Sequence, residues 1–191
     1  LSKASSIIAK GEVSQLSAFN SKEYITKECY YRIIQSKTAE LFASASKIGS
    51  IISGSSLQIQ NLMFDYGKYL GLIFQVKDDA LDYFSTSNKM GKNTGDDFFE
   101  GKLTLPVILL YENISDDEKE EIHKIFTRDS ERTNSELDNI INLMKSKDIE
   151  EKLNIEISIL LEKAKNCLSM IPITNKYKDY LFELLDFASL R

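Results

Sequence analysis

The scarcity of helix-breaking residues is the feature that most limits how this chain can fold. Only two prolines and eight glycines occur in 191 residues, and the stretches between them are rich in Glu, Lys, Leu, Ile and Ala. Hydrophobic periodicity predicts helices over the segments 1–19, 22–53, 57–85, 96–112, 116–127, 134–146, 148–169 and 174–189. The sequence therefore predicts an all-α protein.

Two of these helices are expected to begin with a capping box. Glu118 follows Ser115 by three residues, and Glu136 follows Thr133 at the same spacing. In this arrangement each of the two side chains accepts a hydrogen bond from the backbone N–H of the other residue. Both pairs predict helix starts rather than functional residues.

Charge and cysteine content exclude several classes of protein. The chain has 24 basic and 29 acidic residues and no basic run, so no nucleic-acid partner is expected. Cys29 and Cys167 are too few for a disulfide framework and lack C-x-x-C spacing, which argues against structural zinc and favours a reducing compartment. The longest apolar run, Leu105 to Tyr111, is too short to span a membrane. We therefore expect a cytoplasmic protein.

One segment, 86–103, concentrates glycine, lysine and acidic residues in a chain otherwise short of glycine. We expect a long loop there, and loops of this kind often carry chemistry. The glycines would allow the ammonium groups of Lys92 and Lys102 to approach phosphate oxygens. Taken alone, such a loop is more often simply solvated.

An aspartate-rich pattern, D-D-x-x-D, stands near the end of the predicted helix 57–85 and consists of Asp78, Asp79 and Asp82. Asp78 and Asp82 are one helical turn apart, so their carboxylates can share a hard cation, whereas Asp79 points about 100° away. Proteins commonly hold Mg²⁺ with one or two carboxylates plus substrate phosphate oxygens. The pattern suggests a diphosphate substrate, and the alternative is a solvated acidic face.

The helix face that carries Asp78 continues backwards along the chain. Gly67, Gly71 and Gln75 precede it at helical spacing. Glycines four residues apart allow a neighbouring helix or a ligand to approach closely. We therefore expect this face to look inward, toward a cavity.

Lys37 is expected to lie within the apolar face of its helix. The residues that form this face are Tyr30, Ile33, Ile34, Leu41, Ala45 and Ile48. Two interpretations stay open: the side chain reaches out to the surface, or its ammonium group faces an anion across a cavity.

Four ordered motifs resemble those of a known enzyme family. They are GEVSQL (11–16), SKTAELF (36–42), YGKYLGLIFQVKDDALDYF (66–84) and MGKNTGDDFFEGKLTLP (90–106). In order and spacing the chain resembles the trans-isoprenyl diphosphate synthases, most closely the long-chain polyprenyl class typified by octaprenyl diphosphate synthase.

The resemblance implies an isoprenoid-synthase-type helical bundle around a central cavity, usually dimeric, which condenses an allylic diphosphate with isopentenyl diphosphate in the presence of Mg²⁺. The product would be a long-chain trans-polyprenyl diphosphate, the precursor of a quinone side chain. By this resemblance Asp78, Asp79 and Asp82 are the second aspartate-rich motif, which binds the metal, with Asp78 and Asp82 as its direct contacts. Lys37 and Lys92 match lysines that hold the allylic diphosphate, Lys102 matches another lysine of the same loop, and Thr38 and Gln75 match polar residues beside the reacting carbons.

The sequence departs from the family pattern in one respect. No first aspartate-rich motif with following arginines occurs between Leu1 and Asp65. We therefore expect residues 1–191 to be the C-terminal portion of a single synthase domain, without its N-terminal helices and inactive alone. The alternatives are a split-gene or non-catalytic subunit of a heteromeric synthase, a decayed relative, and a class I terpene cyclase, whose second metal motif we do not find.

Overall fold

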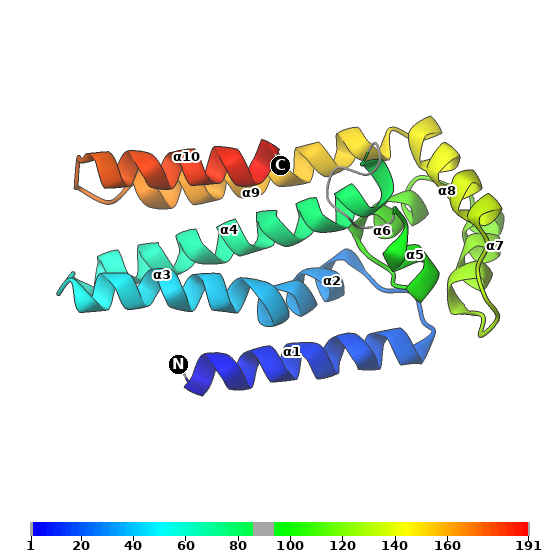
Figure 1. The fold of residues 1–191 in the computed structure, drawn as a ribbon, viewed down its shortest axis with the longest axis horizontal. Coiled ribbons are helices and arrows are strands. Elements are labelled where there is room, and N and C mark those ends of the chain that lie inside the picture. The colour runs from blue at the N-terminus through cyan, green and yellow to red at the C-terminus, as the bar shows by residue number, and fades with distance from the viewer. Residues whose placement is uncertain (1, 86–93, 191) are drawn as a thin grey trace. The chain divides into compact units, whose positions relative to one another are not determined.

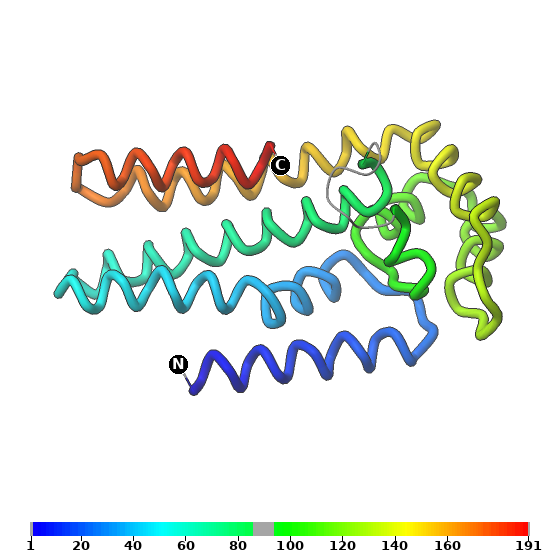
Figure 2. The backbone as a smooth tube through the Cα atoms, in the orientation of Figure 1, coloured from blue at the N-terminus to red at the C-terminus, as the bar shows by residue number. Residues whose placement is uncertain are grey.

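The computed structural model describes residues 2–85 and 94–190, and within these residues it is built from helices without strands (Figures 1 and 2). The prediction of an all-α protein is confirmed. The helices are α1 (Ser2–Ser21), α2 (Lys27–Ile34), the π-helix η1 (Gln35–Ala39), α3 (Glu40–Ile52), α4 (Leu57–Phe84), α5 (Asp96–Glu100), α6 (Leu105–Tyr111), α7 (Asp116–Thr127), α8 (Asn134–Ser146), α9 (Ile149–Ser169) and α10 (Lys176–Leu190).

The chain divides into two compact units. Unit 1 comprises Leu1–Gln15, Tyr31–Lys77 and Glu156–Arg191, and unit 2 comprises Leu16–Tyr30 and Asp78–Ile155. Several long helices, α4 among them, contribute residues to both.

In unit 1, α3 lies alongside α4 because two glycines of α4 face it (Figure 1). A Cβ at Gly67 would meet the carbonyl oxygen of Phe42, and one at Gly71 would stand 2.6 Å from Cα of Ala39. The expectation that these glycines permit a close approach is confirmed, and a neighbouring helix makes that approach. The same unit contains the α9–α10 hairpin, where Lys165 pairs with Asp186 at 2.8 Å.

Unit 2 packs short helices around apolar side chains. All residues of α6 are buried, and the ring of Phe98 from α5 meets that of Phe126 from α7 edge to face, with centroids 5.4 Å apart. Both predicted capping boxes are present, at Ser115 before α7 and at Thr133 before α8. The starts of α7 and α8 therefore follow from local sequence.

Two predicted helices differ in extent from the structure. The segment 22–53 becomes helical only from Lys27: α1 ends before Lys22, whose φ is 54°, and the Thr26 hydroxyl accepts the backbone N–H of Cys29 at the start of α2. The segment 96–112 breaks into α5 and α6 at Gly101, whose φ is 73°. A side chain there would meet the guanidinium of Arg132, so Gly101 needs both the conformation and the space.

None of the helices in the described part of the chain has the length and apolar character that crossing a membrane requires. Cys29 and Cys167 are both free thiols, as the cysteine count predicted.

Candidate functional site

The aspartate-rich pattern lies at the end of α4, in unit 2, where α5 begins nearby. Asp82 accepts backbone N–H groups of Asp96 at 3.1 Å and Asp97 at 3.0 Å, and so caps the start of α5. The backbone N–H of Gly95 also donates to the carbonyl oxygen of Asp82 at 2.8 Å. Part of the segment 86–103, which was expected to be a loop, therefore forms the short helix α5, and hydrogen bonds join its start to Asp82.

Asp79 is the buried member of the pattern. Asp79 is only 4% exposed. Its Oδ2 accepts a 2.6 Å hydrogen bond from the hydroxyl of Tyr30, a residue that is also 4% exposed. Asp78 and Asp82 are half-buried. The three aspartates therefore differ in environment: one is anchored in the packed interior and two are accessible from its edge.

Like charges crowd this part of unit 2. Burial raises the pKa of Asp82 to about 6, and the neighbouring charge of Asp97 adds to the effect. Burial also raises the pKa of Asp97, although Lys102 opposes this. Lys102 pairs with Asp97 at 3.3 Å and with Glu100 at 2.5 Å. One ammonium group thus offsets only part of the acidic charge.

The carboxylates at the end of α4 fit a divalent cation that takes its remaining ligands from outside the protein. In the described ranges 2–85 and 94–190, no three His, Cys, Asp or Glu side chains converge into a complete protein cage for a metal. Mg²⁺ does not need one, because it commonly takes one or two carboxylates and keeps phosphate oxygens as its other ligands. The half-buried carboxylate of Asp82, whose pKa is raised by burial, is a suitable donor, since a nearby cation stabilises its charged form.

A second group of predicted residues lies in unit 1, on and beside the π-helix. The backbone N–H of Glu40 donates to the carbonyl oxygen of Gln35, five residues back, which widens the turn that holds Lys37 and Thr38. The Thr38 hydroxyl donates to Oε1 of Gln75 on α4 at 2.8 Å. The structure therefore brings the predicted site residues Thr38 and Gln75 into contact.

The π-helix also shifts the register of the helix that follows. Tyr30, Ile33 and Ile34 are buried as predicted, but Leu41 is 58% exposed and Ala39 and Ala43 are buried instead. The extra residue per turn rotates all later side chains around the helix axis. The predicted apolar face is therefore wrong beyond Lys37.

Lys37 contacts an anion, but that anion is a side chain of the same protein. Its Nζ donates to Oε1 of Gln15 at 2.7 Å and pairs with Oε2 of Glu12 at 3.3 Å. Both partners belong to α1. Of the other predicted lysines, Lys92 lies outside the described residues.

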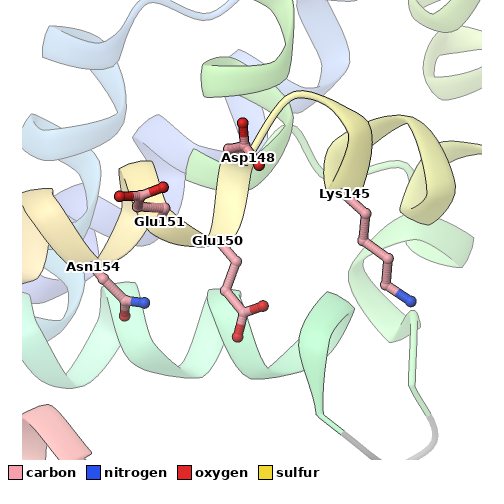
Figure 3. Close-up of a pocket in the computed structure, with 5 residues that line it drawn as sticks. All are labelled: Lys145, Asp148, Glu150, Glu151 and Asn154. Carbon is pink, nitrogen blue, oxygen red and sulfur yellow. The ribbon is translucent and has the colours of Figure 1, made fainter.

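A surface pocket of about 320 Å³ lies elsewhere in unit 2, where α8 passes into α9 (Figure 3). All of its lining residues are exposed, and three of the five are acidic: Lys145, Asp148, Glu150, Glu151 and Asn154. It includes none of the predicted site residues.

Comparison with known proteins places the chain in a family. Residues 1–144 match the family model described as polyprenyl synthetase. The chain belongs to the polyprenyl synthetase family. The resemblance drawn from the four motifs is thereby confirmed.

Individual relatives agree with this assignment. The chain is 46% identical over 108 residues to octaprenyl diphosphate synthase of Escherichia coli (strain K12), covering 56% of this chain and 33% of that protein. It is 30% identical over 181 residues to an all-trans-nonaprenyl-diphosphate synthase (geranyl-diphosphate specific) of Rhodobacter capsulatus, covering 95% of this chain and 54% of that protein. The chain thus spans between a third and about half of the length of these polyprenyl synthetase relatives.

The fold is also that of solved polyprenyl synthases. A polyprenyl synthase from Caulobacter crescentus CB15, crystallised with calcium and isoprenyl diphosphate, matches with a TM-score of 0.91 at 37% identity, over 100% of this chain and 57% of that one. The isoprenoid-synthase-type fold expected from the motifs is confirmed.

Three residues beside the predicted site were missed by sequence reasoning. Glu12 and Gln15 lie in the GEVSQL run, which was used for the resemblance without a role for its side chains. Tyr30 was assigned only to an apolar face, yet its hydroxyl binds Asp79. The spacing of Glu12 and Gln15 along the chain does not identify Lys37 as their partner.

Proposed function

We propose that the complete natural chain is a prenyltransferase that condenses an allylic diphosphate with isopentenyl diphosphate and forms a long-chain trans-polyprenyl diphosphate. One structural observation supports this proposal beyond family membership: the half-buried carboxylates of Asp78 and Asp82 lie one helical turn apart at the end of α4, beside the buried Asp79. Such a group favours a cation that a diphosphate accompanies.

Asp78 and Asp82 are assigned to Mg²⁺, and Asp79 supports them from the interior. The burial of Asp79, which is 4% exposed and anchored by Tyr30, favours this division, because a cation at the edge of the helix reaches the half-buried Asp78 and Asp82 more easily. When bound, Mg²⁺ supplies Lewis-acid stabilisation of the diphosphate oxygens.

The chain's own residues are assigned to the organic substrate. Lys37, Lys92 and Lys102 bind the allylic diphosphate through their ammonium groups. As the allylic C–O bond breaks, its electron pair leaves with the diphosphate, and these positive charges stabilise the charge that develops. Thr38 and Gln75 lie beside the reacting carbons, with the hydroxyl of Thr38 oriented by its hydrogen bond to Gln75.

Carbon–carbon bond formation follows this departure. The double bond of isopentenyl diphosphate supplies an electron pair to the allylic cation, and a new C–C bond forms. The resulting cation loses a proton to a base, for which the departing diphosphate is suitable, and an alkene is regenerated. Apolar side chains protect the cation from water.

The alternative functions, a non-catalytic subunit and a terpene cyclase, differ in the residues that they need. A non-catalytic subunit has no need of the aspartates and of lysines 37, 92 and 102, all of which are present here. The family match favours prenyl transfer over terpene cyclisation. Because the chain spans part of its relatives, we expect the activity, and a homodimer, from the complete natural chain rather than from residues 1–191 alone.

The test is a condensation assay of the complete natural chain with Mg²⁺, a short allylic diphosphate and labelled isopentenyl diphosphate. We expect elongated prenyl diphosphates, and no product after chelation of the metal. Release of a hydrocarbon without use of isopentenyl diphosphate would indicate a cyclase instead. Absence of turnover that a co-purifying partner restores would indicate a subunit of a heteromeric enzyme.

A further inference from the structure

The ammonium group of Lys37 is held by two side chains from one neighbouring helix. Its Nζ lies 2.7 Å from the amide oxygen of Gln15 and 3.3 Å from a carboxylate oxygen of Glu12. These two residues are three positions apart on α1, so their side chains lie next to each other on one helix face. Lys37 therefore has one neutral acceptor and one anion, both from α1 and all within unit 1.

The backbone contact beside this pair is unusually close. A Cβ at Gly11 would lie 2.6 Å from the backbone nitrogen of Lys37 and 2.9 Å from the carbonyl carbon of Ser36. Gly11 is buried, so α1 rests directly on the widened turn of the π-helix. Because Glu12 follows Gly11 immediately, this contact sets the distance from the Glu12 backbone to the Lys37 backbone.

The ion pair itself contributes little to stability. The side chain of Lys37 is 32% exposed and that of Glu12 is 49% exposed, and ion pairs so open to water are worth little. The pair therefore matters for where the ammonium group points and for which charge it faces.

We propose that Glu12 and Gln15 are positioning residues for Lys37: Gln15 directs its ammonium group, and Glu12 is the counter-ion that an incoming diphosphate displaces. This inference rests on the proposed role of Lys37 in binding diphosphate. A lysine ammonium has three N–H donors, so Gln15 keeps one of them while the diphosphate replaces Glu12. The Glu12 carboxylate also repels the incoming diphosphate. It therefore lowers the affinity for diphosphate, although it holds the Lys37 ammonium group in place before diphosphate binds.

The two partners consequently have opposite effects on affinity. In the complete natural chain at fixed Mg²⁺, binding of inorganic diphosphate is measured by titration calorimetry. Glu12→Gln is expected to lower Kd about two- to five-fold, because it removes a competing anion of nearly the same shape. Gln15→Leu is expected to raise Kd about two- to ten-fold, because it removes the acceptor that directs the ammonium group.

Two further variants isolate the contact with Lys37. Glu183→Gln removes the same charge from α10 of unit 1 and is expected to leave Kd unchanged. Lys37→Met is expected to raise Kd, and in that background Glu12→Gln should lose its effect, since coupled residues do not act additively. A damaged fold weakens binding, so the expected tightening is a result that a structural defect cannot produce.

The outcomes separate this inference from the proposed function. If Lys37→Met binds diphosphate as tightly as the wild type, the role of Lys37 fails and the inference fails with it. If Lys37→Met weakens binding but Glu12→Gln leaves Kd unchanged, raises it, or acts equally in both backgrounds, only the inference is overturned. Should Glu12→Gln not fold, Glu12→Asp, one methylene shorter, replaces it and is expected to tighten binding less.

Discussion

The hydroxyl of Tyr30 on α2 donates a 2.6 Å hydrogen bond to the carboxylate of Asp79 on α4, and both residues are 4% exposed. The two side chains come from positions 49 residues apart in the sequence and meet inside unit 2. A carboxylate so deeply buried depends on such donors. This hydrogen bond ties Asp79 to the buried interior of unit 2, whereas Asp82 binds backbone N–H groups at the start of α5.

Tyr30→Phe is expected to destabilise the protein by about 1.5–3 kcal/mol, because hydrogen bonds to charged groups contribute about that much. Urea unfolding measures the change. Tyr177→Phe serves as the control, since Tyr177 is 66% exposed. Equal losses in the two variants would mean that the Tyr30 hydroxyl does not stabilise Asp79.

Asp78→Ala in the complete natural chain is expected to lower Mg²⁺-dependent turnover by about 100-fold or more while leaving the helical circular-dichroism signal intact. A bound metal supplies several kcal/mol of transition-state stabilisation, and each 1.4 kcal/mol corresponds to about a tenfold rate change. Asp65→Ala removes a carboxylate from the same helix, one that pairs with Lys68 at 2.7 Å, and is expected to retain activity. Unchanged turnover in Asp78→Ala would remove Asp78 from the metal site.

Gly11→Ala is expected to destabilise the protein by about 1–3 kcal/mol, because the added methyl group meets the backbone of Lys37 and Ser36, which cannot turn aside. Urea unfolding measures the change, and Gly49→Ala is expected to shift the free energy of unfolding in the opposite direction. Gly49 is exposed within α3 and has nothing within 4 Å of an added Cβ, so alanine should stabilise by about 0.5–1 kcal/mol. Stabilisation by both substitutions would refute the close packing of α1 on the π-helix.

Glu136 makes stability depend on pH. Its hydrogen bonds from Arg128, 2.6 Å long, and from the Thr133 backbone lower its pKa to about 2 from the ordinary 4.5. The contribution of ionised Glu136 to the free energy of unfolding is therefore fully present above about pH 4.5 and is lost as the pH falls toward 2.

Glu136→Gln preserves the capping box and removes only the charge. Because the pair lies near the surface, we expect Tm at pH 7 to fall by about 2 °C and the difference from the wild type to vanish near pH 2. Glu118→Gln, in the capping box without an arginine, should change Tm less. A difference that persists unchanged at the acid end would show that the charge is not responsible.

Local features were predictable because their causes are local. Both capping boxes, the absence of a disulfide and the close approach at Gly67 and Gly71 follow from spacing along the chain. The errors arose where tertiary contacts changed a local pattern. The π-helix after Ile34 moved Leu41 to the surface, and Gly101 divided one predicted helix into two.

The sequence by itself determined the helical class, the family and the aspartates and lysines to which chemistry is assigned, because periodicity and ordered motifs are properties of neighbouring residues. Only the tertiary structure decided that Asp79 is buried against Tyr30, that Asp82 caps α5, and that Glu12 and Gln15 hold Lys37. Each of these partnerships joins residues brought together by helix packing. The charge and solvation of a side chain depend on such neighbours, and spacing along the chain does not reveal them.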